Sequence, residues 1–422
     1  MSHAEDRVDA PTRGYAPDQA HVPAARVAEK TLISLHARHW GMAVILLVGA
    51  SAAAQPAHTT TRLTFYASSA VISGSAQGLT PDLNGDLTDP ATGRTFSRYD
   101  VPTAGGHGFT QVDIVYADAQ VCVGSVAILN VDVLTNALST LATSGFVTPS
   151  EACADYWVAP ALLNQNQAFI TPGLTVVRGP MQRRDGTTVE VVGHRTVGPS
   201  STSQATYELA TGYLLVASTA AQGGAIATLG PGNVATPGAG SSTLTFTELV
   251  NVRTYHLPTA SAVLPDHVRG VRELVYDCVS GTSLGEAVSE LPCDARFTVE
   301  AGGPQWLSLK SVTRLHNPIT GGADASESSA VIAMGMSAGL FLAPEVLAVL
   351  TPQQEVDADP VTGARTVVHS ATSDSVTLAV LAKGENAWLR YDRASGWLLE
   401  TYQERASGAA TSYLRLRLAT VN

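Results

Sequence analysis

The stretch YELATGYLL, from Tyr207 to Leu215, returns as YDRASGWLL, from Tyr391 to Leu399. Each begins with a tyrosine and an acid, passes through a glycine and ends in large apolar residues. An acid four residues before a glycine is typical of a type I turn that closes with a residue in the left-handed region, a connection between antiparallel strands. The pattern therefore predicts a β-hairpin that is used twice.

Other segments recur in the same order. WVAPALL at 157–163 corresponds to FLAPEVL at 341–347, and TPGLTV at 171–176 corresponds to TPQQEV at 351–356. Both pairs keep nearly the offset that separates Tyr207 from Tyr391. Because order and spacing are both kept, we infer two copies of one module. We expect an N-terminal extension and signal peptide over residues 1–54, a first β domain over 55–255 and a second over 256–422.

Apolar and polar residues alternate in both copies, as in strands that bury one face. Between Leu414 and Leu418, leucines alternate with arginines. Pro160 and Pro344 suit the first turn of short helices, where the missing N–H costs nothing. We expect a mainly β fold, with two duplicated antiparallel β domains, half-barrel or sandwich-like, each carrying a short helix. Further turns with an acid or Asn four residues before glycine occur at 89–93, 317–321 and 359–363.

Composition narrows the function classes. The chain has 422 residues, 45% of them hydrophobic, which is enough for a packed core and excludes a wholly disordered protein. Its formal net charge of −11 argues against nucleic acid or an anionic membrane as the main partner.

An apolar run over Met42–Ala50 follows the basic residues Arg38 and His39. Nine residues are too few for a bilayer core, which needs about 20, but they suit the central region of a signal peptide. Small residues follow at once, and we expect cleavage after Ala52 or Ala54. We expect a secreted or periplasmic protein without a transmembrane anchor.

Four cysteines occur in the chain, and an even number in an exported protein predicts disulfides. Pairing Cys122 with Cys153 and Cys278 with Cys293 closes the shortest loops, while two other connectivities stay open. The absence of a C-x-x-C pair argues against zinc, and we expect no metal and no cofactor.

GTSLG, at 281–285, matches the nucleophile motif G-x-S-x-G of α/β hydrolases. That fold needs alternating strands and long helices, which the pattern does not predict. Asp277 lies four residues before Gly281, so we favour a hairpin turn at 277–281. A hydrolase centred on Ser283 is kept as an alternative.

Oxygen-bearing residues alternate over Asp82–Asp89, as in a calcium loop. The sixth position is Leu87 and the twelfth is Gly93, whereas an EF-hand needs Gly and Glu there. We therefore expect a plain Asx/Gly loop, and we keep a structural or adventitious Ca²⁺ site as the alternative, because hard cations bind such carboxylate clusters. The scattered histidines have no metal-ligand spacing, so we assign no catalytic residue and expect a non-enzymatic protein.

The stretch from Tyr391 to Leu399 resembles a hairpin of exported half-barrel proteins similar to the lipoprotein-localisation carriers. In that family a curled sheet holds acyl chains, which implies that this chain binds a lipid or other apolar small molecule. We expect an exported binding protein for an apolar ligand or a partner. The alternative is an extracellular surface or adhesion module that contacts a cell-surface protein. Candidate ligand-binding residues are Trp157, Phe341, Leu342 and Trp397.

Overall fold

The computed structural model describes residues 58–73, 79–97, 107–118, 120–132, 135–164, 174–198, 200–222, 241–257, 263–316, 322–407 and 409–422. The expected signal peptide, its cleavage site at Ala52 or Ala54 and the turn at 317–321 lie outside these ranges. Residues 54–422 form one compact unit, to which the following description applies.

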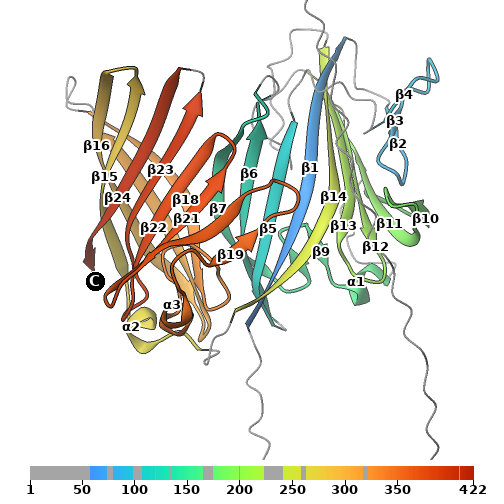
Figure 1. The fold of residues 1–422 in the computed structure, drawn as a ribbon. Helices are drawn as coiled ribbons and strands as arrows, with labels where there is room; N and C mark the ends of the chain where they lie inside the picture. Colours follow the sequence, from blue (N-terminus) through green and yellow to red (C-terminus); the bar gives the residue numbers. More distant parts are fainter. Residues whose placement is uncertain are drawn as a thin grey trace, which may run out of the picture. The chain divides into compact units, whose positions relative to one another are not determined.

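Two large antiparallel sheets, one in each half of the chain, confirm the mainly β prediction (Figure 1). The nine strands of the first sheet follow the order β10 (Leu174–Gln182), β11 (Thr188–Val197), β12 (Ser201–Glu208), β13 (Leu214–Gln222), β14 (Ser241–Leu257), β1 (His58–Ser73), β5 (His107–Ala117), β6 (Val121–Val131) and β7 (Leu138–Pro149). The ten strands of the second follow the order β18 (Ala323–Ala333), β17 (Trp306–His316), β16 (Ala287–Gly302), β15 (Glu273–Leu284), β24 (Ala410–Val421), β23 (Leu398–Ser407), β22 (Glu385–Asp392), β21 (Ser375–Ala382), β20 (Arg365–Ala371) and β19 (Glu355–Ala358).

The two sheets share one strand order, apart from the extra edge strand β19. In each half the first strand pairs with the last, β1 with β14 and β15 with β24, and the next three strands extend the sheet beyond the first. The halves differ after the first strand. The first half carries a small sheet of β2 (Thr80–Pro81), β3 (Leu87–Thr88) and β4 (Thr95–Phe96), whereas β15 and β16 are joined directly by the turn at Gly285 and Glu286.

A short helix accompanies each sheet, as predicted. Helix α1 (Pro160–Asn164) and helix α3 (Pro344–Val349) both begin at the expected proline. Each helix buries a leucine, Leu163 in α1 and Leu347 in α3, against one face of its sheet. We call this face, which packs on the helix, the inner face of the sheet. The two-stranded pair β8 (Ala152–Cys153) and β9 (Trp157–Val158) precedes α1, and one further helix, α2 (Asp266–Arg269), precedes β15.

The repeated stretches form equivalent hairpins, which confirms the turn prediction. Gly396 N–H donates to the Asp392 carbonyl at 2.9 Å, and Gly212 N–H donates to the Glu208 carbonyl at 2.9 Å. The two glycines have φ angles of +80° and +79°, a conformation that side chains disfavour. Glycine is therefore required at both positions.

Each hairpin is tied to the segment before its helix. Leu342 N–H donates to the Gly396 carbonyl at 2.9 Å, and the Tyr391 hydroxyl donates to the Gly339 carbonyl at 3.0 Å. The first half contains the same two bonds, from Val158 N–H to the Gly212 carbonyl and from the Tyr207 hydroxyl to the Asp155 carbonyl, both at 2.9 Å. The repeated residues thus anchor helix to sheet in both halves.

One predicted turn is wrong. Residues 277–281 lie within β15, where Cys278 is directly opposite Cys293 on β16. The hairpin turns instead at Gly285, whose φ is +59°. Strand pairing on both sides of β15 outweighs the local turn signal of the acid and glycine.

A largely buried ionic cluster joins the two halves. Arg62 on β1 donates two hydrogen bonds of 2.7 Å to Asp113 on β5, and lies 3.8 Å from both Asp357 and Asp359 of the second half. Arg253 on β14 pairs with Asp357 at 2.9 Å. Burial by itself would lower the pKa of the Arg62 guanidinium, but the nearby acids, Asp113 above all, raise it above its ordinary value.

The second half also covers the free edge of β7. Thr140 N–H donates to the Glu385 carboxylate, and the Thr140 carbonyl accepts a hydrogen bond from Arg405. Edge strands expose unpaired backbone groups that invite pairing with other chains. The side chains of Glu385 and Arg405 thus provide hydrogen-bond partners for the backbone N–H and carbonyl of Thr140, without adding a strand to the sheet.

Candidate functional site

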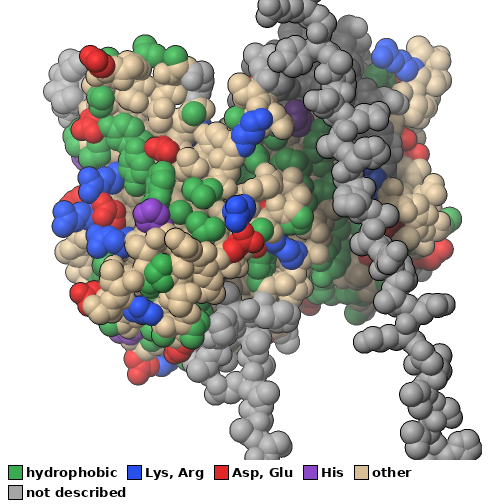
Figure 2. Space-filling model, viewed as in Figure 1, with side chains coloured by type: hydrophobic (Ala, Val, Ile, Leu, Met, Phe, Trp, Pro, Cys, Tyr) green, Lys and Arg blue, Asp and Glu red, His purple; other side chains and the backbone are tan. Residues whose placement is uncertain are grey.

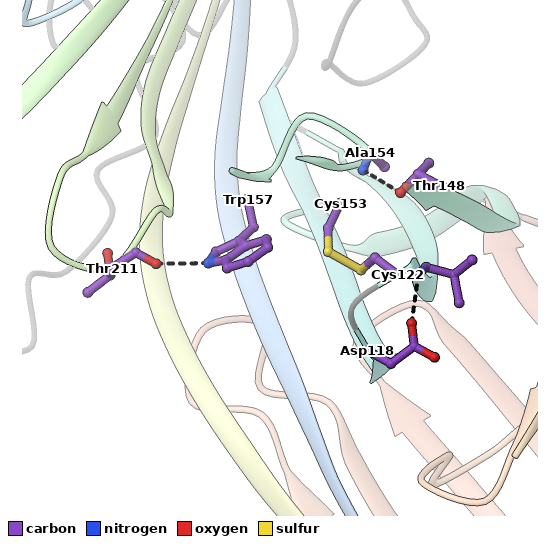
Figure 3. Close-up of a disulfide and its surroundings, with 8 residues drawn as sticks. Asp118, Cys122, Thr148, Cys153, Ala154, Trp157 and Thr211 are labelled. Carbon is purple, nitrogen blue, oxygen red and sulfur yellow. Dashed lines mark hydrogen bonds between the residues drawn. A yellow bond between two sulfur atoms is a disulfide. The ribbon is translucent and has the colours of Figure 1, made fainter. Parts of the chain in front are cut away.

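The four predicted ligand-binding residues contact the protein itself. Phe341, Leu342 and Trp397 are at most 5% exposed and belong to the core of the second half. The rings of Phe341 and Trp397 meet edge to face with centroids 5.7 Å apart. In the first half the indole nitrogen of Trp157 donates to the Thr211 carbonyl at 2.8 Å (Figure 3). Their binding role remains a prediction.

Both disulfides join the cysteines that are closest in sequence. Cys122–Cys153 lies beside Trp157 and links β6 to β8 (Figure 3), and Cys278–Cys293 links β15 to β16. Among the described residues, no group of three or more His, Cys, Asp or Glu side chains is placed to hold a metal ion. Nor is any helix in the described ranges long and apolar enough to span a membrane.

Ser283 and Asp82 occupy ordinary structural positions. Ser283 lies on β15 just before a strand-to-strand turn, and its hydroxyl donates to the Thr411 carbonyl at 3.4 Å. A nucleophile elbow requires a strand-to-helix turn instead. The Asp82 carboxylate accepts the backbone N–H groups of Asn84 and Asp86, at 2.8 and 3.0 Å, and so forms the expected Asx loop.

A cleft of about 320 Å³ opens on the outer face of the first sheet, the face opposite α1. Its floor is apolar, formed by Met181, Leu215, Val216 and Leu249, of which the first three are at most 5% exposed. The remaining lining residues are charged or belong to β14: Arg183, Arg184, Asp185, Glu248, Val250, Asn251 and Val252.

The strands set the shape of this cleft. Arg183 and Arg184 begin the turn between β10 and β11, which places both arginines at the rim. Opposite them, the pairing of β1 with β14 shifts register after Thr64, so that Val250 is an extra residue in β14. Such a bulge bends its strand and redirects neighbouring side chains.

The two arginines differ in their partners. Arg183 pairs with the buried carboxylate of Glu208 at 2.5 Å. Arg184 is exposed and forms no hydrogen bond or ion pair within the part of the chain that the structure describes. Burial raises the pKa of the nearby Tyr66, and the positive charge of Arg184 opposes that shift. Arg184 therefore places an exposed positive charge at the rim of the cleft.

The sequence pattern does not predict this cleft, because lining residues such as Arg184 and Glu248 are far apart along the chain. The sequence feature that points to it is the pair of consecutive arginines before the Asp185-Gly186 turn, which places two positive charges at the end of a hairpin. A second, more open groove of about 610 Å³ lies between the small sheet and strands β10 and β11. None of the four predicted ligand-binding residues lines either one.

Comparison with known proteins assigns no family. No family and no curated protein matches the sequence. A solved structure from the DUF3598 family of Nostoc punctiforme, of unknown function, is 10% identical over 85% of this chain and 95% of its own, with a TM-score of 0.14. A putative AttH from Nitrosomonas europaea is 10% identical over 84% and 91%, with a TM-score of 0.14. Intact Ap-TbpB, with its N and C lobes, is 10% identical over 87% and 79%, with a TM-score of 0.15. Such low TM-scores support no inference about function.

Proposed function

We propose that this chain is an exported, non-enzymatic binding protein whose first half takes a small ligand with an apolar body and an anionic head. The observation that supports it is the cleft on the outer face of the first sheet, which has an apolar floor and, at its rim, an exposed arginine that has no ion-pair partner among the described residues. Its volume of about 320 Å³ lies at the lower end of ligand pockets, which are usually about 300–1,000 Å³.

The lining specifies the ligand's chemistry. Met181, Leu215 and Val216 offer an apolar surface to an alkyl chain. Arg184 supplies the charge that recognises a carboxylate or phosphate head, while Arg183 is already paired with Glu208. Medium-chain acyl carboxylates combine both features.

Export is supported by the disulfides, because such bonds persist in oxidising compartments outside the cytoplasm. A secreted or periplasmic location after removal of residues 1–54 remains part of the proposal.

We also propose that residues 55–255 and 256–422 are two domains that arose by duplication. Their common strand order supports this, as do the anchoring hydrogen bonds of Tyr207 and Tyr391, which occupy corresponding positions of the repeat.

Titration calorimetry with decanoate tests the ligand proposal. We expect saturable one-to-one binding to the native protein, and at least about tenfold weaker binding to Arg184→Ala, since a charged hydrogen bond contributes about 1.5–3 kcal/mol. Arg365→Ala, which removes an exposed arginine of the second half, is the matched control and should bind normally.

Decyltrimethylammonium has the same chain with a cationic head and should bind far more weakly than decanoate. Equal binding of the two amphiphiles, or equal affinity of native protein and Arg184→Ala, would contradict recognition of an anionic head. If neither amphiphile binds, the cleft is not a binding site for alkyl ligands.

A further inference from the structure

The cleft and the more open groove are neighbours on the outer face of the first sheet. Both are bordered by β10, where Pro180 lines the groove and the next residue, Met181, lines the cleft. Leu83 belongs to both surroundings. It lines the groove, and it packs against the apolar cluster that includes Met181, Leu215 and Val216, the floor of the cleft. Leu83 is therefore a boundary between a cleft of about 320 Å³ and a groove of about 610 Å³.

Two glycines make room for the Leu83 side chain. A Cβ atom on Gly193 of β11 would lie 2.8 Å from one methyl carbon of Leu83, and a Cβ atom on Gly179 of β10 would lie 3.2 Å from the other. Gly193 is directly opposite Val177, two residues before Gly179, so the two glycines are diagonal neighbours in the sheet. Leu83 thus fills space that side chains at these two positions would otherwise occupy.

The backbone just before Leu83 is tied to the sheet. Arg195 on β11 donates a hydrogen bond to the Pro81 carbonyl, and Gln204 on β12 donates one to the Asp82 carbonyl. In Figure 2 the part of the molecule at the upper right, where Figure 1 places β2–β4, shows few hydrophobic side chains on its visible side, as expected of a segment whose leucines pack on the sheet. Because the loop is held in this way, Leu83 cannot leave its place without breaking these hydrogen bonds.

The order of residues along β10 gives the direction of a bound ligand. Arg184, the residue proposed to bind the anionic head, follows the last residue of β10 by two positions. Met181 comes next on the floor of the cleft, and Gly179, which lies under Leu83, is two residues further along the same face of the strand. An alkyl chain that starts at Arg184 and stays on the apolar floor therefore ends against Leu83.

We propose that Leu83 limits the length of the alkyl chain that the cleft binds, an inference that rests on the proposed binding of an anionic amphiphile. Each methylene group that becomes buried strengthens binding about fourfold, and this gain stops where the end of the chain meets Leu83. Without the Leu83 side chain, the apolar surface would continue past Gly179 to Val177 and Pro180, which line the groove. Leu83 is thus a residue that determines specificity for chain length.

Titration calorimetry with the unbranched carboxylates from octanoate to tetradecanoate tests this proposal. For the native chain we expect the dissociation constant to fall about fourfold with each added methylene group and then to stay constant from one chain length onward. For Leu83→Ala we expect the fall to continue beyond that length, so that tetradecanoate binds at least about tenfold more tightly to the variant than to the native chain. Leu83 is only half-buried, so the variant should fold.

Two further variants separate the side chain of Leu83 from the segment that carries it. Leu83→Ile keeps the side-chain volume and should keep the native limit. Leu79→Ala is the matched control, because Leu79 belongs to the same segment but packs on Leu244, Phe246 and Ala220, none of which lines the cleft. Its loss should leave the limit unchanged. Near-ultraviolet circular dichroism verifies that each variant is folded.

A limit at the same chain length in the native protein and in Leu83→Ala overturns this proposal and leaves the binding of decanoate at Arg184 intact. The proposal is equally wrong if the native chain shows no limit up to tetradecanoate, or if Leu79→Ala extends the limit as far as Leu83→Ala does. If no carboxylate of any length binds the native chain, the ligand proposal fails and the role of Leu83 fails with it.

Discussion

Replacing Arg62 by methionine is expected to lower the free energy of unfolding by about 3–5 kcal/mol, the usual cost of removing one partner from a buried ion pair. Methionine keeps much of the side-chain volume and removes only the charge and its hydrogen bonds. Asp113 would then lose two hydrogen bonds of 2.7 Å, and Asp359, whose side chain is 3% exposed, would lose a nearby cation.

Urea unfolding of Arg62→Met and Arg365→Met measures this effect. Arg365 pairs with Glu355 at 2.5 Å, but their side chains are 60% and 45% exposed, so its loss should cost about 1 kcal/mol or less. Two equal losses of stability would show that the cluster of Arg62 does not hold the halves together. We further expect that Asp113→Asn in the Arg62→Met background restores part of the stability, since it removes the carboxylate left without its partner.

Gly396→Ala is expected to lower the free energy of unfolding by about 2–5 kcal/mol, the sum of a backbone cost and a packing cost. A side chain at positive φ costs about 1–2 kcal/mol. The new methyl group would also overlap the Leu342 carbonyl oxygen and lie 2.6 Å from the Phe341 ring, and relief of such overpacking costs about 1–3 kcal/mol more. The substitution thus strains the anchor between hairpin and helix.

Gly363→Ala separates the two contributions, because Gly363 has a φ of +71° and nothing within 4 Å of a Cβ atom. We expect only the backbone cost of about 1–2 kcal/mol there. Gly212→Ala should resemble Gly396→Ala, since its methyl group would overlap the Val158 carbonyl oxygen. If the denaturation midpoints of all three variants coincide, close packing of the anchor contributes nothing to stability.

The predictions that the structure confirms concern residues close in sequence. The turns that end at Gly212 and Gly396 are closed by hydrogen bonds between residues four apart. Helices α1 and α3 begin at prolines whose ring suits a first helical turn. At these positions the local turn and helix signals agree with the strand pairing of the folded chain, so the sequence pattern predicts the structure correctly.

The site could not be predicted in the same way. The cleft combines residues of β10, β13 and β14, which are far apart in sequence and share one sheet only because the strands pair in the order β10-β11-β12-β13-β14. The extra residue Val250, which shifts the register there, leaves no mark in the sequence pattern.

By itself, the sequence determined the strand class, the two recurring hairpins with their short helices, and which cysteines lie close enough to pair over short loops. Each depends on turn geometry and alternation within a short stretch of the chain. Only the tertiary structure decided that residues 277–281 continue β15, that Arg62 meets Asp357, and that Leu79 and Leu87 pack on the outer face of the first sheet. Register and contact between distant strands depend on which faces the whole chain can bury at once, and no local segment carries that information.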